Sequence, residues 1–431
     1  MIESKTQKIQ LPKVRQFVGE VHLPGSKSIS NRALLLAAIA KGETILENLP
    51  YSDDVQILLA QLPKLGVSAN HIDRKLNSQT VSIAGISGSF KIDSGEFNVE
   101  NAGTALRPLV ALLSVGKGSF TVDGNAQMRR RPIGDLVEAV KSVGVNISMS
   151  KDGTPPVQID TKGWQSGRLT ISGKSSSQFI SALLMAAPLT KQRVVIELPE
   201  PSVSQPYIDL TIQMMSQFGV SVDNHSYTRY TIKEGQSYIS PGHYYIEGDA
   251  TAATYFMTAG LLSGPVRIYG LDESSIQGDI EYLDVIKKQG GQVITGKNWI
   301  EVKNKSPIQG LTIDMNRMPD AAMTVAASAL FANQPIEIRN VENLRVKESE
   351  RIRGLRIELE KLGASVDEWQ DGLRVHAPIA LRSAEIETYQ DHRMAMAFSL
   401  ASFGVPITIL DPECVNKTYP DYFNDFKQIC Q

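Results

Sequence analysis

The sequence contains few of the features that mark several protein classes. Its 431 residues include only two cysteines, Cys414 and Cys430, too few for a disulfide framework or a cysteine-based zinc site. No apolar run approaches the roughly 20 residues that span a bilayer, and residues 1–15 lack the apolar core of a signal peptide. The net charge of −2 gives no sign of a nucleic-acid partner or a membrane surface. We therefore expect a cytoplasmic protein of two or more domains.

Several ligand motifs are also missing. The patterns GxGxxG and GxxxxGK[ST] do not occur, so ATP and dinucleotide binding lack their usual signatures. His392 has no HxxH or HExxH pattern around it, and a structural role is the simpler interpretation. We expect no metal and no cofactor.

What is present is a repeat. Six segments begin with polar residues, continue as a helix rich in small and apolar residues, and lead into an alternating strand. Because apolar residues occupy most faces of these helices, we expect them to be buried. The helical segments are 30–40, 103–113, 177–187, 249–259, 320–330 and 391–401. The strands begin 70 to 76 residues apart, at Thr44, Phe120, Val194, Val266, Ile336 and Ile407.

A second series of helices keeps nearly the same spacing. Five amphipathic helices end at a glycine, the usual left-handed residue past a helix end, and a strand follows each one. These glycines lie 71 to 78 residues apart, at Gly66, Gly144, Gly219, Gly290 and Gly363. A sixth helix is expected near 419–429, with the strands near 8–23 completing its unit. Two coincident series indicate a six-fold internal repeat.

The repeat predicts the fold class. We expect an α/β protein with two domains, an inside-out α/β barrel of six subunits of about 70 residues, three per domain. Parallel helices would be buried inside and the sheets would lie outside. The expected domains are 1–24 plus 246–431 and 25–245, with the active site in the cleft between them.

The polar starts of the buried helices suggest an anion site. A helix N-terminus offers free N–H groups and a positive dipole end, and Lys27 and Arg32 add cations at the first of these starts. Ordinary capping by Ser28 or Ser30 with two solvated cations is the alternative for that stretch alone. The basic run 128–132 and the charged run 343–351 can likewise be solvated surface. If the helices of a domain run parallel, their starts share one side and favour a strongly anionic ligand.

Nine stretches resemble successive signatures of the 5-enolpyruvylshikimate-3-phosphate synthase family, of the glyphosate-sensitive type. They are LPGSKSISNRALLLAA, NAGTALRPL, SSQFISALLMAAPL, EGDATAATYF, QGDIEYLDV, PDAAMTVAASALFA, LRVKESERIRG, YQDHRMAMAFSLA and KTYPDYF. The resemblance runs from end to end of the chain. Gln127, Arg130 and Gln205 differ from the residues common in the family beside the site.

The resemblance implies a reaction between two anionic substrates. Shikimate 3-phosphate and phosphoenolpyruvate would give 5-enolpyruvylshikimate 3-phosphate and phosphate by addition and elimination. Asp320 would accept the proton of the 5-hydroxyl and Glu348 would donate one to carbon, with Lys27 as a third catalytic residue. The roles of the two carboxylates alternate, so either can serve both steps.

The resemblance also implies the binding residues. Shikimate 3-phosphate would contact Lys27, Ser28, Arg32, Ser176, Ser177, Gln178, Ser204, Asp320, Asn343 and Lys347, with Tyr207 packing on its ring. Phosphoenolpyruvate would contact Lys27, Gly103, Arg131, Gln178, Arg351, Arg393 and Lys417. Gly103 would leave room beside the smaller substrate.

Two alternatives remain open. A UDP-N-acetylglucosamine enolpyruvyl transferase shares the fold and chemistry, but typically carries a cysteine in the loop that corresponds to 123–131, where this chain has none. A non-catalytic protein that binds a phosphorylated ligand on the same scaffold is the other. We expect an enzyme that acts as a monomer, without nucleic-acid or membrane partners.

Overall fold

The computed structural model describes residues 7–75, 77–174 and 176–430 of the chain. The chain divides into two compact units. Unit 1 is Met1–Pro24 with Glu247–Gln431, and unit 2 is Gly25–Ile246. Residues 1–6, which belong to the first of the expected domains, lie outside the described part.

Unit 2 contains three four-stranded sheets of one design. In each sheet an edge strand runs parallel to its neighbour, and the remaining two strands are antiparallel. The first sheet is β14 (His243–Tyr245), β3 (Lys41–Pro50), β5 (Ser78–Ile86) and β4 (Ser68–Arg74). The second is β6 (Ser94–Asn98), β7 (Gly118–Asp123), β9 (Val157–Thr161) and β8 (Asn146–Ser148). The third is β10 (Arg168–Thr170), β11 (Val194–Glu197), β13 (Arg229–Ile232) and β12 (Asp223–His225).

Unit 1 repeats this design with one shorter sheet. The first sheet is β2 (Gly19–His22), β15 (Val266–Tyr269), β17 (Trp299–Lys303) and β16 (Gln292–Gly296). The second is β18 (Thr312–Asp314), β19 (Ile336–Arg339), β21 (Gly372–His376) and β20 (Ser365–Trp369). The third holds three strands, β22 (Glu385–Ile386), β23 (Ile407–Leu410) and β1 (Lys8–Leu11).

The N-terminal strands divide between two repeats. β1 pairs antiparallel with β23, as expected for a strand that completes the sixth repeat. β2 instead runs parallel to β15, in the sheet of the fourth repeat. The expectation that both strands complete the sixth repeat is therefore wrong for β2. In unit 2 the equivalent edge strand is β14, which comes from the end of the unit and pairs with β3.

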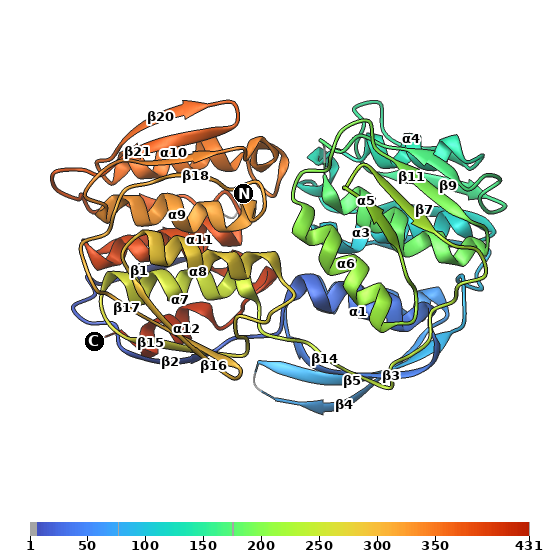
Figure 1. Cartoon of the computed structure of the whole chain (residues 1–431), viewed down its shortest axis with the longest axis horizontal. Helices are drawn as coiled ribbons and strands as arrows, with labels where there is room; N and C mark the ends of the chain where they lie inside the picture. The colour runs from blue at the N-terminus through green and yellow to red at the C-terminus, as the bar shows by residue number, and fades with distance from the viewer. Residues whose placement is uncertain (1–6, 76, 175, 431) are drawn as a thin grey trace, which may run out of the picture. The chain divides into compact units, whose positions relative to one another are not determined.

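The six small-residue helices form the buried interior of the two units (Figure 1). Unit 2 holds α1 (Lys27–Ile39), α3 (Gly103–Val115) and α5 (Ser177–Ala186). Unit 1 holds α7 (Ala250–Leu262), α9 (Ala322–Ser328) and α11 (His392–Ser399). Short 3-10 turns precede α9 as η5 (Pro319–Ala321) and follow it as η6 (Ala329–Phe331), while η8 (Leu400–Phe403) extends α11. The alanines and other small side chains let these helices pack closely, which confirms the buried-helix prediction.

A second helix completes each repeat. These helices are α2 (Asp53–Gln61) with η1 (Pro63–Leu65), α4 (Gly134–Ser142), α6 (Gln205–Gln217), α8 (Tyr282–Lys288), α10 (Arg351–Lys361) and α12 (Tyr422–Gln428). The five predicted glycines all follow them with positive φ, between 74° at Gly66 and 98° at Gly363. Other 3-10 segments are η2 (Met128–Arg130), which precedes α4, η7 (Glu342–Val346), which precedes α10, and η9 (Pro412–Lys417), which precedes α12. No helix in the described part of the chain is both long and apolar enough to span a membrane.

Candidate active site

In unit 2 the buried helices are open to solvent only at their first turns. Every residue of α1 is buried except Ser28, every residue of α3 except Thr104, and every residue of α5 except Gln178. These three residues lie where free backbone N–H groups and the positive ends of the helix dipoles are found. A ligand that reaches these helices therefore meets their N-termini, and an anion is favoured there.

The first turn of α1 holds a buried ion pair. Ser26 caps the helix by accepting a hydrogen bond from Ile29 N (3.4 Å). Lys27, the first residue of the helix, places its Nζ 3.3 Å from Oδ2 of Asp54 on α2. Both side chains are buried, at 8% and 2% exposure. The carboxylate fixes the position of the ammonium group at the start of the helix.

Arg32 is a buried cation among neutral groups. Its Nε donates to Thr211 Oγ1 (2.8 Å), and its two terminal nitrogens donate to the backbone oxygens of Ser28 (3.0 Å) and Tyr207 (3.5 Å). Burial lowers the pKa of the guanidinium to about 10. A buried charge whose hydrogen-bond acceptors in the described structure are all neutral is costly. Such a residue is best explained by an anionic ligand that completes its shell.

Gly103 lies against two buried guanidinium groups. A Cβ atom built on this glycine would lie 2.0 Å from Nη1 of Arg107 and 3.1 Å from Nη1 of Arg131. Arg131 also donates to Asn101 Oδ1 (3.3 Å), while the amide nitrogen of Asn101 donates to Gln127 Oε1 (2.7 Å). Gln127 thus acts by orienting an amide, a function that a cationic side chain would not reproduce.

The starts of α5 and α6 supply further polar groups. Ser176 caps α5, with its Oγ accepting from Gln178 N (3.2 Å), and Ser177 is buried beside it. The Oε1 of Gln178 is buried and has no hydrogen-bond partner among the described residues. Ser204 adopts a left-handed conformation with φ 54° just before α6, and Tyr207 follows in the first turn. The unpartnered amide oxygen is a further sign of a ligand.

We call these groups the unit 2 cluster. It comprises Lys27, Ser28, Arg32, Gly103, Arg131, Ser176, Ser177, Gln178, Ser204 and Tyr207. Hydrogen bonds connect the helices that carry them: Asn31 Nδ2 on α1 donates to Thr104 Oγ1 on α3 (2.6 Å), and Thr211 on α6 donates to Ser181 Oγ on α5 (3.0 Å). The structure therefore brings all ten residues predicted in unit 2 to helix starts that are linked to one another or, for Arg131, to a loop beside one.

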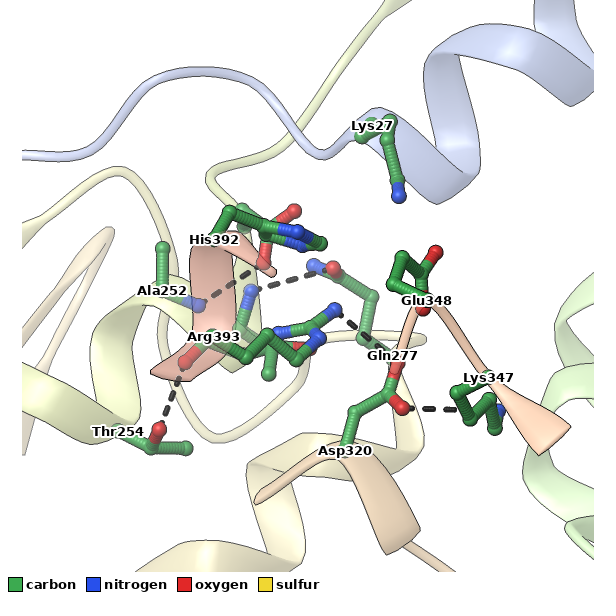
Figure 2. A network of polar contacts seen from close by, with 12 residues as sticks. Lys27, Ala252, Thr254, Gln277, Asp320, Lys347, Glu348, His392 and Arg393 are labelled. Atoms are coloured by element: carbon green, nitrogen blue, oxygen red, sulfur yellow. Dashed lines mark hydrogen bonds and ion pairs between the residues drawn. The ribbon is translucent and has the colours of Figure 1, made fainter. Parts of the chain in front are cut away.

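In unit 1 the central carboxylate is Asp320, which lies in η5 just before α9. Its Oδ1 is 2.8 Å from Arg351 Nη1 and 3.5 Å from Lys347 Nζ. Its Oδ2 is 3.0 Å from Arg393 Nη2. Figure 2 shows Asp320 joined to Lys347, with Glu348 and Arg393 close by.

These cations determine the ionisation of Asp320. Burial alone would raise the pKa of its carboxyl group. The positive charges of Arg393, Lys347 and Arg351 outweigh burial and hold that pKa far below its usual range, although Glu348 acts in the opposite direction. Asp320 is therefore ionised at neutral pH.

Arg351 joins three carboxylates. Besides its bond to Asp320, its Nη2 donates to Glu348 Oε2 (2.9 Å) and its Nε donates to Asp391 Oδ2 (2.8 Å). Burial would lower the pKa of this guanidinium, but the negative charges of Asp391, Glu348 and Asp320 raise it further above its ordinary value. Arg351 is 1% exposed and Asp391 is fully buried. The arginine thus holds the two predicted acid–base residues on one rigid group.

The local folding of three segments places these side chains. Arg351 is the first residue of α10, which Glu350 caps by accepting from Arg353 N (2.8 Å). Asp391 caps α11 by accepting from Arg393 N (3.0 Å). Arg345 anchors the loop with Lys347 and Glu348, because its guanidinium donates to Gln370 O and to both Glu350 and Glu368.

We call Asp320, Lys347, Glu348, Arg351, Asp391 and Arg393 the unit 1 cluster. Two further residues predicted in unit 1 lie on neighbouring segments. Asn343 belongs to η7, the turn that leads into Lys347, and Lys417 is a buried residue at the end of η9, which packs against α11. Among the described residues, no cluster of three or more histidine, cysteine, aspartate or glutamate side chains is arranged to hold a metal ion.

Sequence reasoning missed two carboxylates. Asp391 lay within a quoted motif, and its place just before a helix indicates a cap, but nothing in the pattern indicates its pairing with Arg351. Asp54 lies at the start of an ordinary amphipathic helix, and only tertiary packing places it beside Lys27. Carboxylates of this kind can be found by searching, for each buried cation, for the acidic residue that balances its charge.

Comparison with known proteins identifies the family. The family model described as EPSP synthase (3-phosphoshikimate 1-carboxyvinyltransferase) matches residues 11–426. The chain belongs to the EPSP synthase family. This confirms the family resemblance carried by the nine sequence motifs.

Relatives in the EPSP synthase family match over their full length. The 3-phosphoshikimate 1-carboxyvinyltransferase of Shewanella sp. (strain ANA-3) is 46% identical over 427 residues, covering 98% of this chain and 99% of the relative. The protein of the same name from Shewanella loihica is 46% identical over 429 residues, covering 99% of this chain and 100% of the relative.

Solved structures share the fold. EPSP synthase from Acinetobacter baumannii superposes with a TM-score of 0.81 at 24% identity, covering 99% of this chain and 98% of that one. The enolpyruvyl transferase NikO from Streptomyces tendae gives a TM-score of 0.79 at 17% identity, with 98% of each chain covered. The two-domain α/β fold expected from the repeats is thus confirmed.

Proposed function

We propose that this chain transfers the enolpyruvyl group of phosphoenolpyruvate to the 5-hydroxyl of shikimate 3-phosphate and releases phosphate, a step of the shikimate pathway toward aromatic amino acids. The full-length match to curated 3-phosphoshikimate 1-carboxyvinyltransferases supports this reaction. The structural observation that carries the proposal is the pair Asp320 and Glu348, two carboxylates bonded to the same buried Arg351. Addition followed by elimination needs one group to accept a proton and one to donate it.

The unit 2 cluster supplies most of the contacts proposed for shikimate 3-phosphate. The phosphate would complete the shell of Arg32 and the start of α5, where Ser176, Ser177 and Gln178 lie. Ser28 and Ser204 add neutral donors, and Tyr207 packs on the ring. In unit 1, Asp320, Asn343 and Lys347 complete the proposed set.

Phosphoenolpyruvate requires more cations, because it carries both a carboxylate and a phosphate. Arginine matches these groups with paired N–H donors. The proposed contacts are Lys27, Gly103, Arg131, Gln178, Arg351, Arg393 and Lys417. The lack of a side chain at Gly103 supports this set, because a Cβ there would lie 3.1 Å from Nη1 of Arg131 and crowd the guanidinium.

The charges suggest how Asp320 becomes a useful base. In the free protein its carboxylate is too strongly stabilised by three cations to accept a proton readily. When the anionic substrate groups bind Arg393, Arg351 and Lys347, they share these positive charges, and the pKa of Asp320 rises toward a value suited to catalysis. Substrate binding thereby activates the base that the reaction needs.

The proposed reaction has two steps, an addition and an elimination. Glu348, a carboxylate beside Arg351 in the free protein, takes up a proton from solvent when the anionic substrates bind. It donates this proton to C3 of phosphoenolpyruvate while the 5-hydroxyl oxygen attacks C2, and Asp320 accepts the hydroxyl proton. The Glu348 carboxylate then takes a proton back from C3 of the tetrahedral adduct as the C2–O bond to phosphate breaks, and Asp320 gives its proton to the departing phosphate. Lys27 and the arginines stabilise the charge that develops on the leaving phosphate.

We also propose a cytoplasmic monomer. Both cysteines are free thiols, as expected in a reducing compartment. Light scattering coupled to gel filtration tests the monomer, for which a dimer mass would be the contrary result.

Phosphate release from phosphoenolpyruvate tests the reaction. Shikimate 3-phosphate and UDP-N-acetylglucosamine are offered separately as acceptors to the wild type, Asp320→Ala and Glu348→Gln. We expect release with shikimate 3-phosphate alone, and at least a 100-fold loss in both variants, in line with the roughly 10²–10⁴-fold contribution of general acid–base catalysis. Release only with the nucleotide sugar would identify the sister activity. Ligand binding without release would favour the non-catalytic alternative.

A further inference from the structure

A buried carboxylate in unit 1 has no part in the proposed mechanism. Glu358 on α10 is fully buried. Its Oε1 accepts a hydrogen bond from the Tyr389 hydroxyl (2.7 Å), and its Oε2 accepts from Glu387 N (3.1 Å) and from Lys361 Nζ (2.7 Å). These three donors fix the position of the buried carboxylate, and the segments that carry them indicate what the carboxylate holds in place.

Three residues on one face of α10 contact a single segment of chain, residues 389–391. Arg351, Gly354 and Glu358 are spaced three and four residues apart, so they lie on the same side of the helix. Arg351 binds Asp391, and Glu358 binds Tyr389. A Cβ atom on Gly354 would lie 3.3 Å from Tyr389 Cε2, so the missing side chain lets the tyrosine ring pack directly on the helix.

Residues 389–391 begin with an unfavourable backbone conformation. Tyr389 and Gln390 both have positive φ, 55° and 57°. Two successive non-glycine residues in the left-handed region are strained, and such a turn persists only where its surroundings hold it. A hydrogen bond from Asp391 N to Thr388 O (2.9 Å) closes the turn.

The position of this turn affects two arginines, Arg393 and Arg351, through Asp391. Directly after it, Asp391 accepts from Arg393 N and caps α11. The same carboxylate accepts from Nε and Nη2 of Arg351. Displacement of the turn would therefore move both guanidinium groups that we assign to phosphoenolpyruvate.

We propose that Glu358 is a positioning residue for phosphoenolpyruvate binding, because its bond to the Tyr389 hydroxyl holds the left-handed turn that sets Asp391, Arg351 and Arg393. This inference rests on the proposed function. Burial and the charge of Glu358 also raise the pKa of Tyr389, so its hydroxyl keeps the proton that it donates.

The test compares Tyr389→Phe and Glu358→Gln with the wild type. Tyr389→Phe retains the ring against Gly354 and removes only the hydroxyl. We expect the KM for phosphoenolpyruvate to rise about 10-fold, the effect of losing one hydrogen bond to a charged group. The KM for shikimate 3-phosphate should change less than twofold. In the Glu358→Gln background, the added effect of Tyr389→Phe on the KM for phosphoenolpyruvate should fall below threefold, because Glu358→Gln has already weakened the bond that Tyr389→Phe removes.

Glu360→Gln is the matched control. Glu360 lies on the same helix, is partly exposed, and pairs with Arg356 rather than with residues 389–391. It loses the same charge, and both KM values should stay within twofold of the wild type.

The outcomes separate the inference from the proposed function. Equal changes in both KM values, or unchanged values in Tyr389→Phe with the wild type active, would overturn the positioning role and leave the reaction standing. A fall in thermal stability without a selective change in the KM for phosphoenolpyruvate would also overturn it. An inactive wild type with shikimate 3-phosphate would overturn the proposed function itself.

Discussion

Arg351 and Asp391 form a two-point ion pair inside unit 1. Arg351 Nε lies 2.8 Å from Asp391 Oδ2, and Nη2 lies 3.2 Å from Oδ1. Both side chains are buried, and Ser349 Oγ donates a further bond to the carboxylate (2.9 Å). Because the fork geometry of arginine fixes direction as well as distance, this pair directs Nη1 of Arg351 toward Asp320 and the second N–H of Nη2 toward Glu348.

Removal of the charge on Asp391 should be costly. Asp391→Asn leaves the buried guanidinium of Arg351 with one fewer counter-charge, so we expect the free energy of unfolding to fall by about 3 kcal/mol. Urea titration followed by tryptophan fluorescence measures this loss. Asp284→Asn, which removes an exposed partner of Lys287, should cost less than about 1 kcal/mol. A loss as small at Asp391 would contradict the pairing.

Asp320 should make stability depend on pH in acid. Its pKa in the folded protein lies far below the value of about 3.9 in an unfolded chain. Its contribution to stability is therefore complete above the unfolded value and is lost as the pH falls through the folded one. Between pH 4 and pH 2, the advantage of the wild type over Asp320→Asn should shrink by about 1.4 kcal/mol per pH unit. Urea unfolding of both proteins at several pH values checks this, and a constant difference would refute it.

A methyl group on Gly103 should interfere with the smaller substrate. In Gly103→Ala the new Cβ displaces the Arg107 and Arg131 side chains, for which overpacking typically costs about 1–3 kcal/mol. We expect the KM for phosphoenolpyruvate to rise between about fivefold and 100-fold. We also expect the inhibition constant of glyphosate, a longer analogue, to rise by a larger factor.

The control for Gly103→Ala is Gly134→Ala, whose Cβ would make only an ordinary contact of 3.7 Å with Met149. Its kinetic constants should stay close to those of the wild type. Equal factors for phosphoenolpyruvate and glyphosate at position 103 would show that the methyl group does not discriminate by ligand length.

The Lys27–Asp54 pair allows stability and catalysis to be separated. Lys27→Met leaves the carboxylate of Asp54 buried without its ammonium partner, so we expect a loss of about 3–5 kcal/mol in the free energy of unfolding. Lys27→Met with Asp54→Asn removes both charges and should recover most of that loss. Phosphate release should remain impaired in both proteins. Recovery of activity in the double variant would show that Lys27 serves the fold alone.

The sequence was informative about whatever repeats or caps a helix locally. Alanine-rich helices and the left-handed glycines Gly66 and Gly363 revealed the six repeats, because each is a local signal. The partner of β2 was not predictable, since β15 lies about 250 residues away and either edge satisfies the same strand pattern. Segments 320–330 and 391–401 are broken by 3-10 turns that composition does not mark.

The candidate site shows the same division. The cations at helix starts were found by residue type, and the motifs added the remaining assignments. The counter-charges were not found, because Asp54 and Glu358 lie on outer helices with an ordinary alternation of polar and apolar residues. Only tertiary packing determines that these two carboxylates are buried and that each meets a group near the site.

The interruption of unit 1 by unit 2 along the chain has a consequence for the gene that encodes the protein. Unit 2 is one continuous stretch of chain, whereas unit 1 is interrupted after Pro24 and resumes at Glu247. The two sides of the interruption are bonded, with Asp249 N donating to Pro24 O (3.0 Å). The chain therefore leaves unit 1 and returns to it at two adjacent points, and the coding segment of unit 2 is a contiguous cassette. A gene can acquire, lose or exchange such a cassette without altering the order of any strand that remains.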